Sequence, residues 1–287
     1  MTTHFDSQKQ YAVQLETFLP DQPGRLRRLL AQVPGLSVDG SYQGQLETGV
    51  GQAQLCIEPG DVLHVVHRPA EVPDPGEALQ RSGQLPGNLR FSIDRSGMNL
   101  LADTHLDGEV HLQRSFAEIA AGFTAALQEA TTDDQTQSPP IPSEEVARAL
   151  EEPCFEGEEM VVQLDDGWEL SPRIDGTSTA VHLAINDARL RLQRPVVVDL
   201  GSKADLKALA CQALRHNAQL RMARLVWRDD QIVAEAWLHD QQVTGHWILT
   251  TARAVAVAAE HTFPALEILA RQVAVADHYH KVIDQEP

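Results

Sequence analysis

Residues 100–108 read LLADTHLDG, and residues 232–240 read IVAEAWLHD. In each stretch every second residue suits a buried sheet face, as in a β-strand, and each stretch ends in a polar turn. Each also follows a shorter apolar stretch across a turn, which predicts a hairpin. A hairpin pattern that occurs twice in one chain predicts that the chain contains the same small domain twice.

The first half of the chain predicts the order helix, three strands, helix, two strands, helix. Proline and glycine mark the turns between these elements. Ser115 and Glu118 form a Ser-x-x-Glu capping box, which predicts that the closing helix begins there. The expected elements are a helix at 25–32, strands at 35–42, 51–58 and 62–69, a helix at 76–83, a hairpin at 89–106 and a helix at 115–130.

The second half predicts the same order, and its last helix is expected to bend or break near Pro264. The expected elements are a helix at 143–152, strands at 167–174, 179–186 and 188–195, a helix at 205–216, a hairpin at 224–240 and a helical region at 250–279.

The segment TTDDQTQSPPIPSEE, 131–145, separates the halves and lacks apolar periodicity, as linkers do. We therefore predict a first α+β domain at 1–130, a linker at 131–144 and a second α+β domain at 145–287. Each is expected to be a two-layer domain, an antiparallel sheet with helices on one face.

The alternation in the last strand of each half separates its two faces. Leu100, Ala102, Thr104 and Leu106 share the face that helices should cover, as do Ile232, Ala234, Ala236 and Leu238. The opposite face is mixed and carries aromatic residues, which are enriched at protein contacts. The candidate partner-binding residues are Leu101, His105, Val233, Trp237, Trp227 and Trp247. Two alternatives stay open: the two copies pack on each other at this face, or Trp237 is covered by its own loops.

The composition excludes several classes of protein. The chain of 287 residues has 23 basic and 41 acidic side chains, a net charge of −18, which argues against a nucleic-acid partner. No apolar run is long enough to span a membrane and no secretion signal begins the chain, so a cytoplasmic protein is expected. Three widely spaced cysteines, Cys56, Cys154 and Cys211, predict buried thiols.

Catalytic, cofactor and metal sites are not predicted. The sequence has no phosphate-binding glycine loop and no nucleophile elbow. His64 and His67 are three residues apart, so on a strand they point to opposite faces and do not share a metal ion. If the protein were an enzyme with an unrecognised site, His64, His67 and Glu58 would be the first residues to examine.

The hairpins and closing helices of both halves resemble the type III secretion chaperone fold, the CesT and YbjN-like superfamily. The resemblance rests on AQLCIEPGDVLHVVHRP, LRFSIDRSGMNLLADTHL and SFAEIAAGFTAALQEA in the first half, and on VHLAINDARLRLQRP and LVWRDDQIVAEAWL in the second. It implies a bacterial cytoplasmic protein that holds a partner protein, such as a segment of a secreted effector, without ATP. Members are typically homodimers, so two fused copies imply a monomeric pseudo-dimer or a weak homodimer. The alternatives are a YbjN-like regulatory or structural protein with a constitutive contact, and an enzyme with an unrecognised His/carboxylate site.

Overall fold

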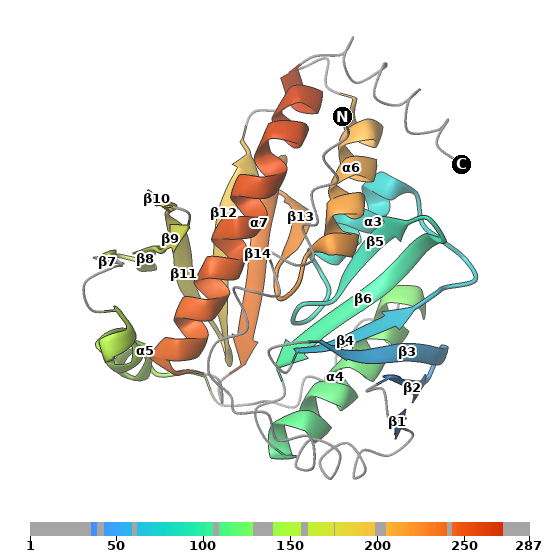
Figure 1. The fold of residues 1–287 in the computed structure, drawn as a ribbon, viewed down its shortest axis with the longest axis horizontal. Coiled ribbons are helices and arrows are strands. Elements are labelled where there is room, and N and C mark those ends of the chain that lie inside the picture. Colours follow the sequence, from blue (N-terminus) through green and yellow to red (C-terminus); the bar gives the residue numbers. More distant parts are fainter. Residues whose placement is uncertain are drawn as a thin grey trace.

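The protein has a mixed α+β fold built on antiparallel sheets, as the sequence predicts (Figure 1). A computed structural model describes residues 36–38, 43–58, 62–105, 109–128, 140–155, 160–174, 176–198, 205–239 and 243–271. Two six-stranded sheets and one two-stranded ribbon make up the strand layers of these residues.

The first sheet has the strand order β1-β2-β3-β4-β6-β5. Helix α3 lies in the chain between β4 and β5, and helix α4 follows β6. The elements are β1 (Leu36–Val38), β2 (Gln43–Thr48), β3 (Gly51–Glu58), β4 (Val62–His67), α3 (Pro75–Ser82), β5 (Arg90–Asp94), β6 (Gly97–His105) and α4 (Glu109–Gln128).

The second sheet has the order β13-β14-β12-β11-β8-β7, and β9 and β10 form the ribbon. Helix α7 packs along β12 and β14 on one face of this sheet (Figure 1). The elements are α5 (Ser143–Leu150), the short 3₁₀ helix η1 (Pro153–Phe155), β7 (Met160–Leu164), β8 (Gly167–Ser171), β9 (Arg173–Ile174), β10 (Thr177–Ser178), β11 (Val181–Asn186), β12 (Arg189–Val197), α6 (Leu206–Gln219), β13 (Arg224–Arg228), β14 (Gln231–His239) and α7 (Gly245–Arg271).

Four strands follow the same order in both sheets, β3-β4-β6-β5 in the first and β11-β12-β14-β13 in the second. The last hairpin of each set has a two-residue turn, since Asp94 pairs with Gly97 and Arg228 pairs with Gln231. Superposing these turns places Trp237 opposite Asp103, and not opposite His105 as the two quoted stretches suggest. The shift is two residues, so the inward and outward faces are unchanged.

The predicted helix-facing residues of β6 and β14 are confirmed as core residues. Leu100 and Ala102 are buried in the first sheet, and Ile232, Ala234 and Ala236 are completely buried in the second. In the first sheet this face packs on Phe116, Ile119 and Phe123 of α4 in one apolar core, whereas α7 supplies the corresponding cover in the second. The period-two pattern thus identifies the buried face correctly.

Three strands of the described part of the chain were not predicted: β2, β7 and the two-residue β10. The prediction of a strand at 35–42 is confirmed only at β1, and the longer β2 follows it. The sequence of β2, QGQLET, has one apolar residue, Leu46, so it lacks the alternation of a half-buried strand. Leu46 is buried, and pairing with β3 holds the strand in the sheet. Strand β7 was missed because its apolar run is short and two valines stand side by side in it.

The prediction that the closing helix of the first half begins at Ser115 is wrong. Helix α4 begins at Glu109, so Ser115 lies inside the helix and is not its N-cap. No proline or glycine interrupts residues 109–114, so the helix extends back through them. Glu118 instead forms ion pairs with residues of the second sheet.

A bend or a break was predicted near Pro264, and helix α7 continues through this residue without a break. A proline removes the bond to the carbonyl four residues earlier, here that of Glu260. Pro264 and Glu260 are both exposed, so water can bind the freed carbonyl.

The end of the expected linker belongs to the second sheet. Ile141 is buried and its N–H donates to the Asp187 carbonyl at 3.0 Å, and α5 already begins at Ser143. The predicted helix at 25–32 and most of the linker lie outside the described residues. Cys56, Cys154 and Cys211 form no disulfide among the described residues, and they are half-buried, whereas buried thiols were predicted.

Candidate functional site

The two sheets meet through helices α3 and α6, which lie side by side between them (Figure 1). Each helix contacts the terminal strand of the other sheet: α3 packs on β13, and α6 packs on β5. Gly83, just after α3, comes so close to β13 that an added Cβ would lie 3.3 Å from the Trp227 carbonyl oxygen. The inner edges of both sheets are therefore covered by the opposite half of the chain.

Asn217 of α6 forms hydrogen bonds with the backbone of both inner edge strands, β5 and β13. Its side-chain amide donates to the carbonyl of Phe91 in β5 at 3.1 Å and to that of Leu225 in β13 at 3.0 Å. Its oxygen accepts the Leu225 N–H at 2.7 Å, and the residue is completely buried. Ser82 of α3 accepts the N–H of Phe91 at 2.9 Å. Backbone groups that a partner strand would use are thus already bonded.

Arg90 begins β5 and is completely buried. Its guanidinium lies 2.7 Å from Asp103 and donates to the carbonyls of Asn217 at 3.0 Å and Leu220 at 2.6 Å, both in the second half. Asp103 also contacts His64 Nδ1 at 2.6 Å and accepts the N–H of Met222 at 3.1 Å.

These contacts decide the charge state of Asp103. Burial alone would raise the pKa of this carboxyl, but the positive charge of Arg90 and the contact with His64 outweigh it and hold the pKa well below its usual range. Asp103 is therefore ionised at neutral pH, and its charge is matched inside the protein.

Arg224 begins β13 and is the equivalent of Arg90: it lies in the second half and contacts carbonyls of the first half. It donates to Glu235 at 2.6 Å and to the carbonyls of Leu85, at 3.1 Å, and Leu89, both in the first half. Arg228 donates to Glu235 at 2.8 Å and to the Gly83 carbonyl at 2.6 Å.

Burial would raise the pKa of Glu235, but Arg224 and Arg228 lower it below the ordinary value. Each half thus sends a buried, acid-paired arginine to carbonyl oxygens of the other half.

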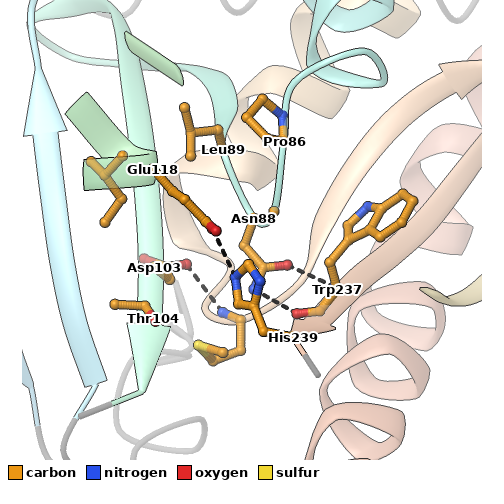
Figure 2. Close-up of a pocket in the computed structure, with 11 residues that line it drawn as sticks. Pro86, Asn88, Leu89, Asp103, Thr104, Glu118, Trp237 and His239 are labelled. Atoms are coloured by element: carbon orange, nitrogen blue, oxygen red, sulfur yellow. Dashed lines mark hydrogen bonds and ion pairs between the residues drawn. The ribbon is translucent and has the colours of Figure 1, made fainter. Parts of the chain in front are cut away.

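We call the contact surface between the two halves of the chain the seam. A small pocket lies on it (Figure 2). Asn88 fixes one wall, because its side-chain amide accepts the N–H of Trp237 at 3.0 Å and donates to the Trp237 carbonyl at 3.3 Å. On the opposite side Glu118 of α4 pairs with His239 at 3.1 Å. The cavity volume is about 20 Å³, which is room for about one water molecule and none for a substrate. The pocket is a gap in a contact surface.

Among the described residues, helices α3 and α4 reach the face of the second sheet opposite α7 near β13 and near Arg189 and His239, and we call the rest of that face the open face. Opposed residues of neighbouring strands share a face, so the register defines its members. They are half-buried or exposed: Val162, Leu164, Gly167, Glu169, His182, Ala184, Arg191, Gln193 and Trp237. Val162 and Leu164 are each 39% exposed. The equivalent face of the first sheet carries polar Gln45, Gln52 and Gln54 in its outer strands β2 and β3, where the outer strand β7 of the second sheet exposes two apolar side chains.

The six candidate partner-binding residues do not form one patch. Leu101 and Val233 are buried at 3% and 5% exposure, while Trp237 is half-buried on the open face. Trp227 and Trp247 pack against the core, and the side chain of His105 lies outside the described part. Trp237 contacts the other half of the chain, which is one of the alternatives that the sequence left open. Binding of an outside partner through these residues stays a prediction.

The residues to be examined for an enzyme do not converge either. His64 is bonded to Asp103 on the seam, whereas His67 lies on the opposite face, 5.8 Å from the ring of Phe123. This confirms that the two histidines point apart. The side chain of Glu58 is not described. Within the described ranges no three His, Cys, Asp or Glu side chains could hold a metal ion, and no helix could cross a membrane.

The sequence did not predict that Arg90, Arg224, Asn217 and Glu118 form contacts between the two halves of the chain. One signal was present: Arg90 and Arg224 stand at the same distance before the turns of their hairpins. An arginine at an otherwise apolar strand start, found twice, indicates a buried ion pair in both places.

Comparisons with known proteins add little. No family model matches the chain, and no curated protein matches it. Among solved structures, the chain is similar to the di-domain ARO/CYC StfQ from the steffimycin biosynthetic pathway, with 9% identity over 92% of this chain and 96% of that one. The TM-score is 0.14, so this similarity carries no argument about the function of the chain.

Proposed function

We propose that the protein is a non-enzymatic, cytoplasmic protein-binding module made of two fused copies of a domain like the type III secretion chaperones. The common strand order β3-β4-β6-β5 and β11-β12-β14-β13 supports the duplication, as does the position of α3 and α6 in each series. Two hairpins with equivalent arginines support it further. A chance likeness would not be expected to extend to the side chains at the seam.

The reciprocal contacts support an internal pseudo-dimer. Arg90 reaches carbonyls after α6, and Arg224 reaches carbonyls after α3. A two-fold interface makes each contact twice with the roles exchanged. A chain with this surface already covered needs no second copy, so we expect a monomer in light scattering.

The open face is the observation that carries the binding function. A protein that leaves Val162 and Leu164 exposed on the same sheet face as half-buried Trp237 presents a surface of the kind that protein partners use. The partner in this proposal is a protein segment, such as part of a secreted effector.

Two matched variants test this proposal. Ala184→Arg places a long charged side chain on the open face, and Gln54→Arg places the same side chain on the equivalent face of the first sheet. We expect Ala184→Arg to lose partners that the wild-type protein retains from its native cell extract, with an unchanged melting curve. Retention of the same partners by Ala184→Arg would contradict binding at the open face.

A second candidate function is that of a YbjN-like regulatory or structural protein with a constitutive contact. The burial of Leu101 and Val233 favours it, because this alternative requires that apolar residues of the outward faces be already covered. Such a protein would co-purify with a stoichiometric partner or with itself, and Ala184→Arg would leave that complex intact. An enzymatic function has less support, since Asp103 is enclosed and bonded to Arg90, His64 and Met222.

A further inference from the structure

Arg191 is the feature of the open face that the binding proposal leaves unexplained. It lies in β12 between Ala184 of β11 and Trp237 of β14, its opposed neighbours in the register. Its guanidinium carbon lies 5.9 Å from the centre of the Trp237 ring, within the range of a cation–π contact. Its Nε is buried without a hydrogen-bond partner among the described residues.

The acidic groups around Arg191 are engaged elsewhere or lie out of reach. Glu118 pairs with His239 at 3.1 Å and with Arg189 at 3.8 Å, and Asp166 pairs with His182 at 3.3 Å. Glu169 shares the face, but no ion pair with Arg191 forms within 4 Å across the described ranges. In a protein of net charge −18, a fixed arginine without a carboxylate partner is an uncompensated cation.

Beside Arg191 the open face has two residues with a small side chain or none, Ala184 and Gly167, and we call the surface that they form the floor. Ala184 is the neighbour of Arg191 in the register, and Gly167, the partner of Leu164, lies next to Ala184, since an added Cβ would be 3.3 Å from the Ala184 Cα. The larger side chains of Leu164 and Arg191 flank these two small residues in the register, and Trp237 follows beyond Arg191. An apolar side chain of a partner can therefore rest on the floor while a neighbouring group reaches the guanidinium.

We propose that the open face receives a protein segment that places a carboxylate on Arg191 and an apolar side chain on the floor formed by Gly167 and Ala184. A cation–π contact with the indole holds the guanidinium near the ring and uses none of its terminal N–H groups, and such a fork binds a carboxylate through two parallel bonds. The inference rests on the proposed protein-binding function and names the chemistry of the partner: an acidic residue next to apolar ones. Because the whole chain is acidic, the rest of that segment should be neutral or basic.

The test selects random short peptides displayed on phage against the full-length protein, and against Arg191→Gln and Arg173→Gln. Arg173 is exposed in β9, so its variant is a matched loss of one positive charge away from the open face. Peptides selected on the wild type and on Arg173→Gln are expected to carry Asp or Glu next to apolar residues, and peptides selected on Arg191→Gln are not.

A double-mutant cycle then measures the contact itself. Changing the acidic residue of a selected peptide to its amide should weaken binding to the wild type about tenfold, because a hydrogen bond to a charged group is involved. The same change should have no effect on binding to Arg191→Gln. Equal losses on both proteins would overturn the assignment of Arg191.

The remaining outcomes are also distinguishable. If peptides bind without acidic enrichment, the carboxylate inference fails while the proposed function stands. If no peptide binds the wild type, both fail. If the full-length chain is a dimer in light scattering that Ala184→Arg converts to a monomer, a second copy occupies the open face and the inference is overturned.

Discussion

Arg90 and Arg224 stand at the starts of equivalent hairpins, and each donates hydrogen bonds to backbone carbonyls of the opposite half of the chain. Each is also paired with a buried carboxylate of its own half, Asp103 or Glu235. The two arginines therefore join the halves and neutralise the charges buried between them.

Arg90→Met tests the cost of this arrangement. It leaves Asp103 buried without its guanidinium partner, and removing one member of a buried ion pair costs about 3–5 kcal/mol. We expect urea unfolding to show a loss of this size. Arg95→Met, in the exposed turn of the same hairpin, should change stability by less than about 0.5 kcal/mol. Equal losses for the two variants would show that the seam is not where Arg90 acts.

Asn217→Leu tests the seal between the two inner sheet edges. The substitution keeps the branched shape of the side chain but removes three hydrogen bonds, and it leaves the Phe91 carbonyl and the Leu225 N–H without their partners. At about 1–3 kcal/mol for each unsatisfied buried group, we expect a loss of about 3 kcal/mol. Asn186→Leu, at an exposed strand end, is the matched control and should be nearly neutral. Hydrogen exchange at Leu225 should accelerate in Asn217→Leu alone.

The buried faces could be predicted because they depend on local pattern. Leu100 and Ala102 alternate with Leu101 and Asp103, and this period of two identifies the core face without knowledge of the partner strands. A shift of two residues leaves this period unchanged. The sequence alone therefore makes His105 the equivalent of Trp237 in the other half, whereas the structure makes Asp103 its equivalent.

The seam could not be predicted in the same way. Asn217 and Phe91 are 126 residues apart, and Arg224 and Leu89 are 135 apart. No local pattern carries such contacts, and the acceptors are backbone carbonyls, which are the same in every sequence. The sheet face that carries the candidate partner-binding residues is therefore, in part, a contact between the two halves that the sequence did not predict.

His216 should make the protein sensitive to acid. Burial, with a smaller effect of His261, lowers the pKa of His216 from 6.5 to about 4. The unfolded chain binds a proton as the pH falls below 6.5, while the folded protein does not until about pH 4. The stability contribution is therefore complete above pH 6.5 and is lost between 6.5 and 4, with a total of about 3 kcal/mol.

Unfolding measured across this pH range checks the effect. His216→Gln should flatten the pH dependence between 6.5 and 4. An unchanged slope in His216→Gln would assign the acid sensitivity to other groups.

Gly167 begins β8 and forms part of the floor of the open face, and we expect substitution even by alanine to destabilise the protein. Its φ is 153°, and an added Cβ would lie 2.1 Å from the carbonyl oxygen of Leu183, a backbone atom held in the sheet. Gly176 also has positive φ, at 83°, but an added Cβ there meets nothing within 4 Å. Gly176→Ala should therefore cost only the conformational strain of about 1 kcal/mol, and Gly167→Ala at least about twice that, because β8 must also move away from β11. Thermal unfolding of the two variants compares them directly, and equal shifts would show that strain alone, and not the close approach of β8 to β11, requires glycine at 167.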